Sequence, residues 1–360
     1  MERVTGIGGV FFKSPDPESL RESYAEHLGV TPGSDGNVAF EWRGKNEPER
    51  VGYTVWAPFK HDTSHFDPNR GREHMRRGSL KRAINWAAAL AVVSASAAPA
   101  PAQTVSEMLD ADVAPGAATL WYLGHAGWAV KTRSRLLIFD YWESHEPPRN
   151  ASLANGFIDA AEIAGQRTIV FVTHQHGDHY DPKIFHWADS IGNITYVFGW
   201  NVTTDRPVVR MLGLRQTRQI DGVVVATINH EFDNVAEVAF MVEVDGLVIY
   251  HSGDHGTVTD DPNPVFIDNI DYLSSLGKRI DIAFVSTFGR IGGGMVNAGD
   301  RYTIEKLSPK SLFPMHHGDN EDLYERFAHE IENDGLKTAV HYADGRGDCF
   351  TYVAGRVRKN

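Results

Sequence analysis

A run of closely spaced histidines after a short apolar segment is the feature that most constrains this chain. The sequence Thr-His-Gln-His-Gly-Asp-His directly follows Thr168 to Val172, whose valine, isoleucine and phenylalanine content is typical of a buried strand. Imidazole nitrogens and carboxylate oxygens are ligands that zinc and similar metals accept. On a loop at a strand end, His174 and His176 can reach one ion, while Asp178 and His179 can face a second. The motif therefore predicts a metal site; a surface histidine cluster and a single-ion site are the alternatives.

Further candidate ligands follow three later apolar segments. His230 comes after a segment that begins at Val223, Asp254 lies in a Ser-Gly-Asp sequence, and His316 follows Leu-Phe-Pro-Met. Each stands at the end of an expected strand, so all three can converge on one edge of the sheets. Taken alone, such residues are more often loop histidines or capping aspartates. Beside the first motif they become candidate ligands, and His316 is preferred to its neighbour His317 because it stands directly at the strand end.

The composition excludes several other classes of protein. Of the 360 residues, 42% are hydrophobic and 23% are charged, which excludes a disordered, collagen-like or coiled-coil chain. The 35 basic and 47 acidic residues give a net charge of -12, which disfavours nucleic acid as a partner. No apolar run reaches the roughly 20 residues that span a bilayer, so we expect no stable membrane insertion. The single cysteine, Cys349, leaves the redox compartment undetermined. We expect a small-molecule substrate; the sequence does not fix the oligomeric state.

Strand-like segments recur between residues 115 and 360, and helical stretches fall between or after them. The expected strands are Thr119 to Leu123, Trp128 to Lys131, Leu136 to Asp140, Thr168 to Val172, Ile194 to Phe198, Val223 to Ile228, Val238 to Val244, Leu247 to Tyr250, Ile282 to Val285 and Ser311 to Pro314. The expected helices are Pro182 to Asp189, Tyr302 to Leu307 and Glu321 to Asn333. This order predicts an α/β domain in which helices cover stacked sheets.

Residues 1–70 predict a separate, small α+β module. An apolar segment, Val4 to Phe12, precedes a helical pattern from Asp16 to Gly29, and strand-like segments follow at Val38 to Trp42 and Gly52 to Ala57. Through GIGGVFFKSPDPESLRESYAEHLGV and VAFEWRG…GYTVWAPF, the module resembles half of a vicinal-oxygen-chelate (glyoxalase/bleomycin-resistance) domain, with a βαβββ-like order. Two such modules build one metal-binding sheet in that family. This chain has one such module, and the position of the family's first-strand histidine corresponds to about Gly9, which has no side chain to bind a metal.

Residues 71–114 have the character of an export signal inside the chain, followed by a linker. A basic stretch containing Arg-Arg-Gly-Ser-Leu-Lys, similar to a twin-arginine signal, precedes the apolar run Ile84 to Ala98 and an Ala-Pro-Ala sequence before Gln103. If translation starts at Met75, we expect a periplasmic or secreted protein; otherwise the protein is expected in the cytoplasm. The alternative is an alanine-rich linker or helix between domains.

From about residue 117 onward the chain resembles the metallo-β-lactamase superfamily, and within it the ascorbate-phosphate lactonase-like group of metal-dependent hydrolases. The resemblance rests on WYLGHAGWAV, LLIFDYW, VTHQHGDHYD, TINHEF, YHSGDHG and LFPMHHGD. It implies a four-layer αββα sandwich and two divalent ions, with zinc expected and manganese or iron also compatible. The family pattern assigns the first metal to His174, His176 and His230, the second to Asp178, His179 and His316, and a bridging position to Asp254.

The same resemblance separates the chain from other members of the superfamily. The common zinc β-lactamases use a cysteine in the second site, and Cys349 lies far past the bridging region. Diiron flavoprotein oxidases carry glutamate at the position of His176, so histidine there favours hydrolysis over redox chemistry. Members that process transfer RNA are disfavoured by the acidic net charge and the export-like segment.

These residues predict a binuclear metal-dependent hydrolase. Two cations about 3.5 to 4 Å apart can share a water and lower its pKa toward 7. We expect the resulting bridging hydroxide to cleave an ester, lactone or phosphodiester bond, with Asp178 and Asp254 orienting it and managing its proton. The alternatives are a non-catalytic metal-binding protein and small-molecule binding through the N-terminal module.

Three positions outside the ligand set are candidates for supporting roles. His125, between two early strands, is expected to line the pocket as a catalytic residue or to cap a turn. Asp140, at the end of a strand, is expected to accept a hydrogen bond from a ligand histidine, or to form a turn. The Gly292 to Gly294 stretch is a candidate mobile loop that would bring Arg290 to an anionic substrate.

The export hypothesis predicts the N-terminus of the natively produced protein. If translation begins at Met75 and the signal is removed after Ala102, the mature chain starts near Gln103. N-terminal sequencing of protein purified from its own cells measures this directly. An intact Met1 would contradict export and support the linker alternative.

Overall fold

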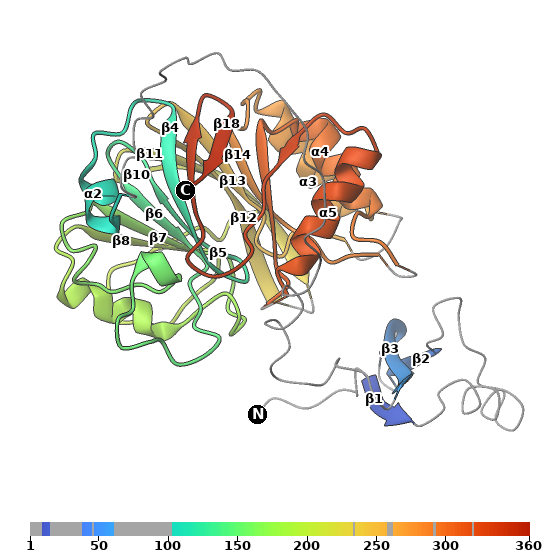
Figure 1. The fold of residues 1–360 in the computed structure, drawn as a ribbon. Helices are drawn as coiled ribbons and strands as arrows, with labels where there is room; N and C mark the ends of the chain where they lie inside the picture. The colour runs from blue at the N-terminus through green and yellow to red at the C-terminus, as the bar shows by residue number, and fades with distance from the viewer. Residues whose placement is uncertain are drawn as a thin grey trace, which may run out of the picture. The chain divides into compact units, whose positions relative to one another are not determined.

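The computed structural model describes residues 9–14, 38–44, 47–60, 103–232, 235–257, 262–290, 293–318 and 320–360. The chain divides into two compact units, Met1–Pro99 and Ala100–Asn360, which are described separately. Figure 1 shows the elements of both.

The first unit contains one three-stranded sheet. Its strands are β1 (Gly9–Ser14), β2 (Val38–Gly44) and β3 (Glu47–Lys60), in the order β1-β3-β2, with β1 parallel and β2 antiparallel to β3. All three overlap strands expected from the sequence. The expected helix from Asp16 to Gly29, and the basic and apolar parts of the export-like segment, lie outside the described residues. The likeness to half a vicinal-oxygen-chelate domain therefore stays a prediction.

The second unit is built on two mixed sheets. The eight-stranded sheet has the order β18-β17-β4-β5-β6-β7-β8-β9, and the seven-stranded sheet has the order β10-β11-β12-β13-β14-β15-β16. The strands of the first are β4 (Ala117–Gly124), β5 (Gly127–Lys131), β6 (Leu136–Phe139), β7 (Thr168–Val172), β8 (Ile194–Phe198), β9 (Val209–Arg210), β17 (Cys349–Val353) and β18 (Arg356–Lys359). Those of the second are β10 (Arg215–Ile220), β11 (Val223–Phe232), β12 (Val235–Val244), β13 (Leu247–His251), β14 (Ile282–Ser286), β15 (Ser311–Met315) and β16 (Ala339–Val340).

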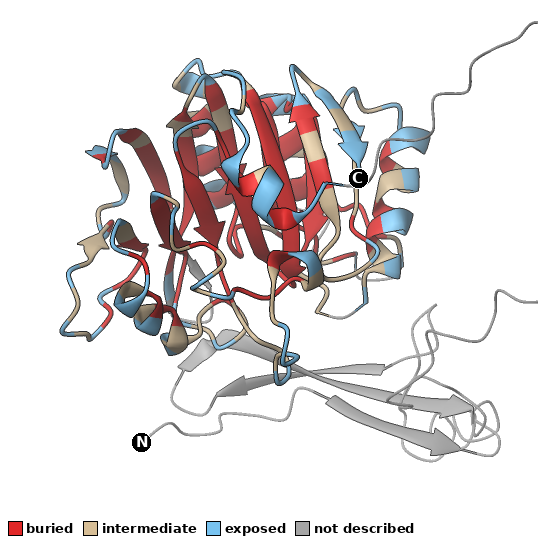
Figure 2. Ribbon diagram, turned by 60° about the vertical axis from the view of Figure 1, so that its left-hand side comes forward, coloured by how far each residue is buried: buried red, intermediate tan, exposed pale blue. Residues whose placement is uncertain are grey.

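The main hydrophobic core lies between the two sheets. Aromatic side chains from both sheets meet there: Trp128 of β5 stacks on Phe284 of β14 with ring centroids 4.6 Å apart, and lies 5.1 Å from Phe313 of β15. Phe139 of β6 and Phe171 of β7 stack on each other within the same cluster. Figure 2 shows the inner strands buried along most of their length. Burial of alternate apolar residues from both sheets holds the sandwich together.

Helices cover the outer faces of both sheets. On the eight-stranded sheet these are α2 (Val105–Asp110) and the 3₁₀ helices η1 (Leu153–Asn155) and η2 (Pro182–Asp189). On the seven-stranded sheet they are α3 (Pro264–Ser275), α4 (Ala298–Leu307) and α5 (Asp322–Asn333), which lie together in Figure 1. The layers agree with the α/β sandwich that the sequence predicts. Within the described ranges, no helix is both long and apolar enough to cross a membrane.

The direction of the strands brings distant parts of the sequence to one edge. β6 and β7 run parallel in one sheet, and β13, β14 and β15 run parallel in the other. Because parallel strands end on the same side of a sheet, the residues that follow β6, β7, β13 and β15 can approach one another. These positions include Asp140, His174, Asp254 and His316.

The packing between the sheets can be tested at Phe284. Its side chain is fully buried against Trp128 and Phe313. Phe284→Ala would leave a cavity there, so we expect the free energy of unfolding to fall by about 3–5 kcal/mol in denaturant titrations. Val353→Ala, at a side chain that is 51% exposed, is the control and should change it by less than about 0.5 kcal/mol. Similar losses in both variants would contradict the described core.

Candidate metal centre

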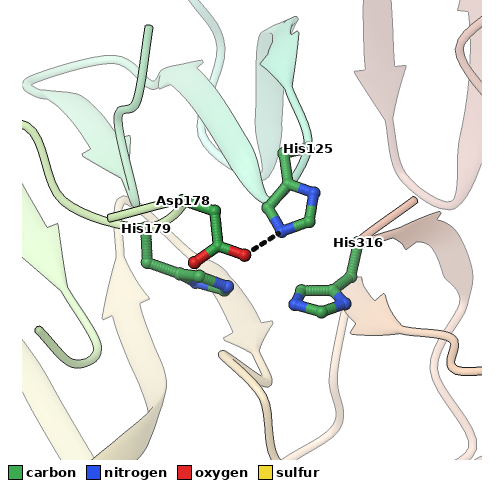
Figure 3. Close-up of side chains that lie close together, drawn as sticks. All are labelled: His125, Asp178, His179 and His316. Atoms are coloured by element: carbon green, nitrogen blue, oxygen red, sulfur yellow. Dashed lines mark ion pairs between the residues drawn. The ribbon is translucent and has the colours of Figure 1, made fainter. Parts of the chain in front are cut away.

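Two groups of potential metal ligands lie where these strands end, and Figure 3 shows the second group. Within each group the ligand atoms lie within 4.8 Å of one another. The first group is His174, His176 and Asp254, and the second is His125, Asp178, His179 and His316. Except for the turn between β4 and β5, which carries His125, the loops that supply them follow β7, β13 and β15.

The carboxylate of Asp140 fixes the start of the histidine motif. Asp140 follows β6, is buried, and has a φ of 41°, which is uncommon for a residue other than glycine. Its Oδ1 accepts the backbone N–H of Thr173 at 2.8 Å, and its Oδ2 accepts the Thr173 hydroxyl at 2.7 Å. Oδ2 also lies 2.8 Å from Nδ1 of His179. The contact expected between Asp140 and a histidine of the motif is therefore present.

Asp254 stands between the two groups and offers one oxygen to each. Its Oδ2 lies 3.4 Å from Nε2 of His174. Its Oδ1 lies 3.0 Å from Nε2 of His179 and 2.9 Å from Nε2 of His316. In the first group, Nε2 of His174 is also 2.9 Å from Nδ1 of His176. This placement suits a carboxylate that contacts two ions at once.

The charges in the centre depend on each other. Burial opposes the charge of Asp254, but the attraction of His179 and the contacts with His174 and His316 together outweigh it and hold the pKa of Asp254 well below its usual range. Burial likewise opposes a charge on His179, yet the carboxylates of Asp254 and Asp140 raise the pKa of His179 above its ordinary value. The contact with His125 lowers the pKa of Asp178. The carboxylates are therefore ionised at neutral pH, as metal ligands must be.

The polar atoms at the centre fit a shared cation. Nε2 of His179, Nε2 of His316 and Oδ1 of Asp254 are buried, and none makes a geometrically sound hydrogen bond with any described residue. Buried polar atoms are otherwise nearly always paired. Two imidazole nitrogens and a carboxylate oxygen that converge in this way form the donor set that zinc and similar ions accept.

The two sheets are joined directly at the centre. His125 lies in the two-residue turn between β4 and β5, and His316 follows β15 of the other sheet. The N–H of His316 donates to the carbonyl of His125 at 3.1 Å. Their φ values are 52° and 82°, a left-handed conformation that is rare away from glycine and is often retained at functional sites. Nε2 of His125 lies 3.3 Å from Oδ2 of Asp178, the contact drawn in Figure 3.

The chain is similar in sequence to known metal-dependent hydrolases. The beta-lactamase superfamily domain matches residues 119–316, more than half of the chain. The chain belongs to this superfamily. A UPF0173 metal-dependent hydrolase from Pyrococcus abyssi is 24% identical over 216 residues, covering 54% of this chain and 83% of the relative. One from Korarchaeum cryptofilum is 27% identical over 201 residues, covering 54% and 81%. The solved structure of Igni18, a metallo hydrolase from Ignicoccus hospitalis, is 17% identical with a TM-score of 0.46, covering 66% of this chain and 98% of that one.

Three other positions considered from the sequence are His230, His317 and Arg290. The side chain of His230 lies outside the described residues; its backbone belongs to β11 and pairs with Glu237 of β12. His317 is absent from both groups, and its ring lies beside Tyr324. Arg290 donates from Nε to the carbonyl of Gly293, while residues 291 and 292 lie outside the described part of the chain.

Two residues near the centre were not singled out from the sequence. Glu237 is a buried carboxyl whose Oε2 lies 3.6 Å from Nδ1 of His174. In the sequence, the one feature that could have pointed to it is a charged residue inside a largely apolar strand. His251 is buried and links two loops of the site: its Nε2 contacts the carbonyl of Ala126 at 2.9 Å, and the N–H of Gly253 donates to its Nδ1 at 3.2 Å. A histidine at the end of β13 gives no sign of this bridging role in the sequence.

The titration of Glu237 gives a test of the electrostatics. Burial, and then the charge of Asp254, raise the pKa of Glu237 from 4.5 to about 9. The folded state therefore keeps a proton that the unfolded state releases, and folding becomes less favourable as pH rises across this window. Glu237→Gln does not titrate, so its stability relative to the natural protein should increase from pH 5 to pH 9.

Denaturant unfolding of chelator-treated protein across this pH range measures the difference. Glu325→Gln is the matched control, because the side chain of Glu325 is 55% exposed. A stability difference between Glu237→Gln and the natural protein that does not change with pH would contradict the buried, protonated carboxyl.

Proposed function

We propose that this chain is a hydrolase that works through two divalent ions held at the edge of its stacked sheets. The observation that carries the proposal is the position of Asp254, whose two oxygens face two separate groups of histidines. The relatives from Pyrococcus abyssi and Korarchaeum cryptofilum are named metal-dependent hydrolases, which supports the same class of activity.

Each ion would be held by one group of side chains. The first would take His174 and His176, with His230 as the third histidine, and the second would take Asp178, His179 and His316. Asp254 would bridge the two. Zinc is the expected metal, and manganese and iron accept the same nitrogen and oxygen ligands.

The side chains around the ions would have different roles in hydrolysis. When bound, the two ions would supply a Lewis acid for the substrate oxygen and an acidified water as nucleophile. Asp178 is the exposed member of its group, with a side chain that is 42% accessible, so it can pass a proton to solvent. Asp254 is buried and stays ionised because His179, His174 and His316 lie against it. Asp140 keeps the His179 ring in one orientation.

Aromatic side chains flank the proposed site and suit a small organic substrate. The ring of Trp142 lies 5.6 Å from that of His125, and the ring of Phe288 lies 4.7 Å from that of His316. Both residues are half-buried. We propose an ester, lactone or phosphodiester as the bond that is cleaved. A lactone is the first choice because of the resemblance to the lactonase-like group, since the fold alone does not name the bond.

The proposal predicts that metal content and turnover depend on the same residues. We expect about two ions per natural chain, and loss of both bound metal and hydrolysis in His176→Ala and Asp254→Ala, because each removes a ligand. Metal quantification and assays on lactone, phosphodiester, thioester and β-lactam substrates measure this. His329→Ala is the control, since the side chain of His329 is 65% exposed on α5.

Three outcomes would count against the proposal. Full hydrolysis by either ligand variant would refute the assignment. A folded natural protein without metal would remove the proposed chemistry. Bound metal without hydrolysis across the panel would favour the non-catalytic metal-binding alternative.

A further inference from the structure

We propose that His125 is a hydrogen-bond donor to the substrate and not a ligand of either ion. The inference rests on the proposed function, because it concerns which residues of the second group bind the ion and which one contacts the substrate. The distances between ligand atoms place His125 in the second group, so all four residues of that group could be taken as ligands of one ion. The hydrogen bonds on the far side of the rings separate His125 from His179.

The backbone fixes which nitrogen of His125 carries the proton. The N–H of Gly318 donates to Nδ1 of His125 at 2.9 Å. A backbone amide can only donate, so Nδ1 must supply a lone pair. In a neutral imidazole the remaining proton then sits on Nε2. Nε2 could offer a second lone pair to a metal only if the ring lost both protons.

His179 and His174 have the opposite arrangement. Nδ1 of His179 lies 2.8 Å from the carboxylate of Asp140, which accepts, so Nδ1 holds a proton. Once the second proton leaves the ring, Nε2 is the nitrogen that offers a lone pair. The hydroxyl of Thr173 donates to Asp140, so its oxygen accepts from Nδ1 of His174 at 3.0 Å. Metal-bound histidines have this pattern, with the second ring nitrogen donating to an oxygen. His125 reverses it.

The proton on Nε2 of His125 faces Oδ2 of Asp178 at the edge of hydrogen-bond distance. His125 is 7% exposed, and its Nε2 makes no geometrically acceptable hydrogen bond with any described residue, although Oδ2 of Asp178 lies 3.3 Å away. A buried donor without an acceptor is costly unless a ligand completes it. A substrate oxygen that gains negative charge during hydrolysis is the acceptor that such a donor would stabilise most.

The backbone around His125 keeps the ring in place. Its carbonyl accepts the N–H of His316 at 3.1 Å, and the hydroxyls of Tyr122 and Tyr324 each lie 3.4 Å from the same oxygen. A donor held this rigidly needs no reorganisation when charge develops on the substrate, which is the basis of oxyanion stabilisation.

Metal content distinguishes a donor from a ligand. His125→Gln keeps an N–H donor, and His125→Ala removes it; if His125 is a donor, both should bind as many zinc ions as the natural protein. His179→Ala should lose the second ion, and His329→Gln is the neutral control. In cobalt-loaded protein, the visible absorption bands should be unchanged in His125→Gln. Loss of an ion, or cobalt bands altered as in His179→Ala, would overturn the proposal.

A second measurement needs no metal and no substrate. Ring nitrogen chemical shifts of ¹⁵N-histidine-labelled protein, assigned by comparison with His125→Gln, report which nitrogen is protonated. We expect the Nε2–H form at His125 with or without zinc, and an Nδ1–H form would overturn the inference. A natural protein that binds none of zinc, manganese and iron would refute the proposed function, while this spectrum still decides the state of His125.

The contact with substrate is tested with inorganic phosphate as an oxyanion probe. In zinc-loaded protein, calorimetry should show phosphate binding that is weakened at least tenfold by His125→Ala and partly restored in His125→Gln. Equal phosphate affinity in the natural protein and His125→Ala, or no binding to the natural protein, would overturn the donor role.

Discussion

The centre depends on the hydrogen bonds of one buried carboxylate, that of Asp140. Burying a charge costs free energy unless donors surround it. Here the Thr173 N–H, the Thr173 hydroxyl and Nδ1 of His179 all donate to it. Burial raises the pKa of Asp140, but the hydrogen bond to His179 and the nearby histidines lower it further than burial raises it. The same bonds define the path of the loop after β7 and turn the lone pairs of His174 and His179 toward Asp254. One residue thus sets both the loop and the orientation of two imidazoles.

Neither sheet supplies the centre alone, so its geometry depends on how the sheets pack. Asp140 and the histidine motif follow strands of the eight-stranded sheet, while Asp254 and His316 follow strands of the seven-stranded sheet. The aromatic core around Trp128 and Phe284 lies between these sheets and holds their edges at a fixed separation. Loops on a rigid sandwich can carry polar and strained residues, because the burial of apolar side chains between the sheets stabilises the folded domain by more than these residues destabilise it.

Local sequence predicted much of the fold and the first part of the site. β7 and β8 have the expected bounds because strand-forming residues fill them, and η2 has the expected bounds although it is a 3₁₀ helix. α3 was not expected, even though Asn263 caps it and proline begins it. β17 was not expected either, although its phenylalanine, threonine, tyrosine and valine favour a strand, and it pairs with β4, far away in the chain. The position of His125 in the second group likewise follows from its contact with Gly318, which only the folded chain creates.

The electrostatics of the centre tie metal binding to proton release. Asp140 and Asp254 place two carboxylate charges close together in a buried region, and burial with these charges keeps Glu237 protonated beside them. The pKa of His179 is raised because a proton on its ring compensates part of this charge. A divalent cation supplies that compensation more fully and needs the same Nε2 lone pair, so metal and proton compete for one position. The arrangement that favours a protonated His179 is therefore also the one that attracts a cation, and acid competes with the metal at this residue.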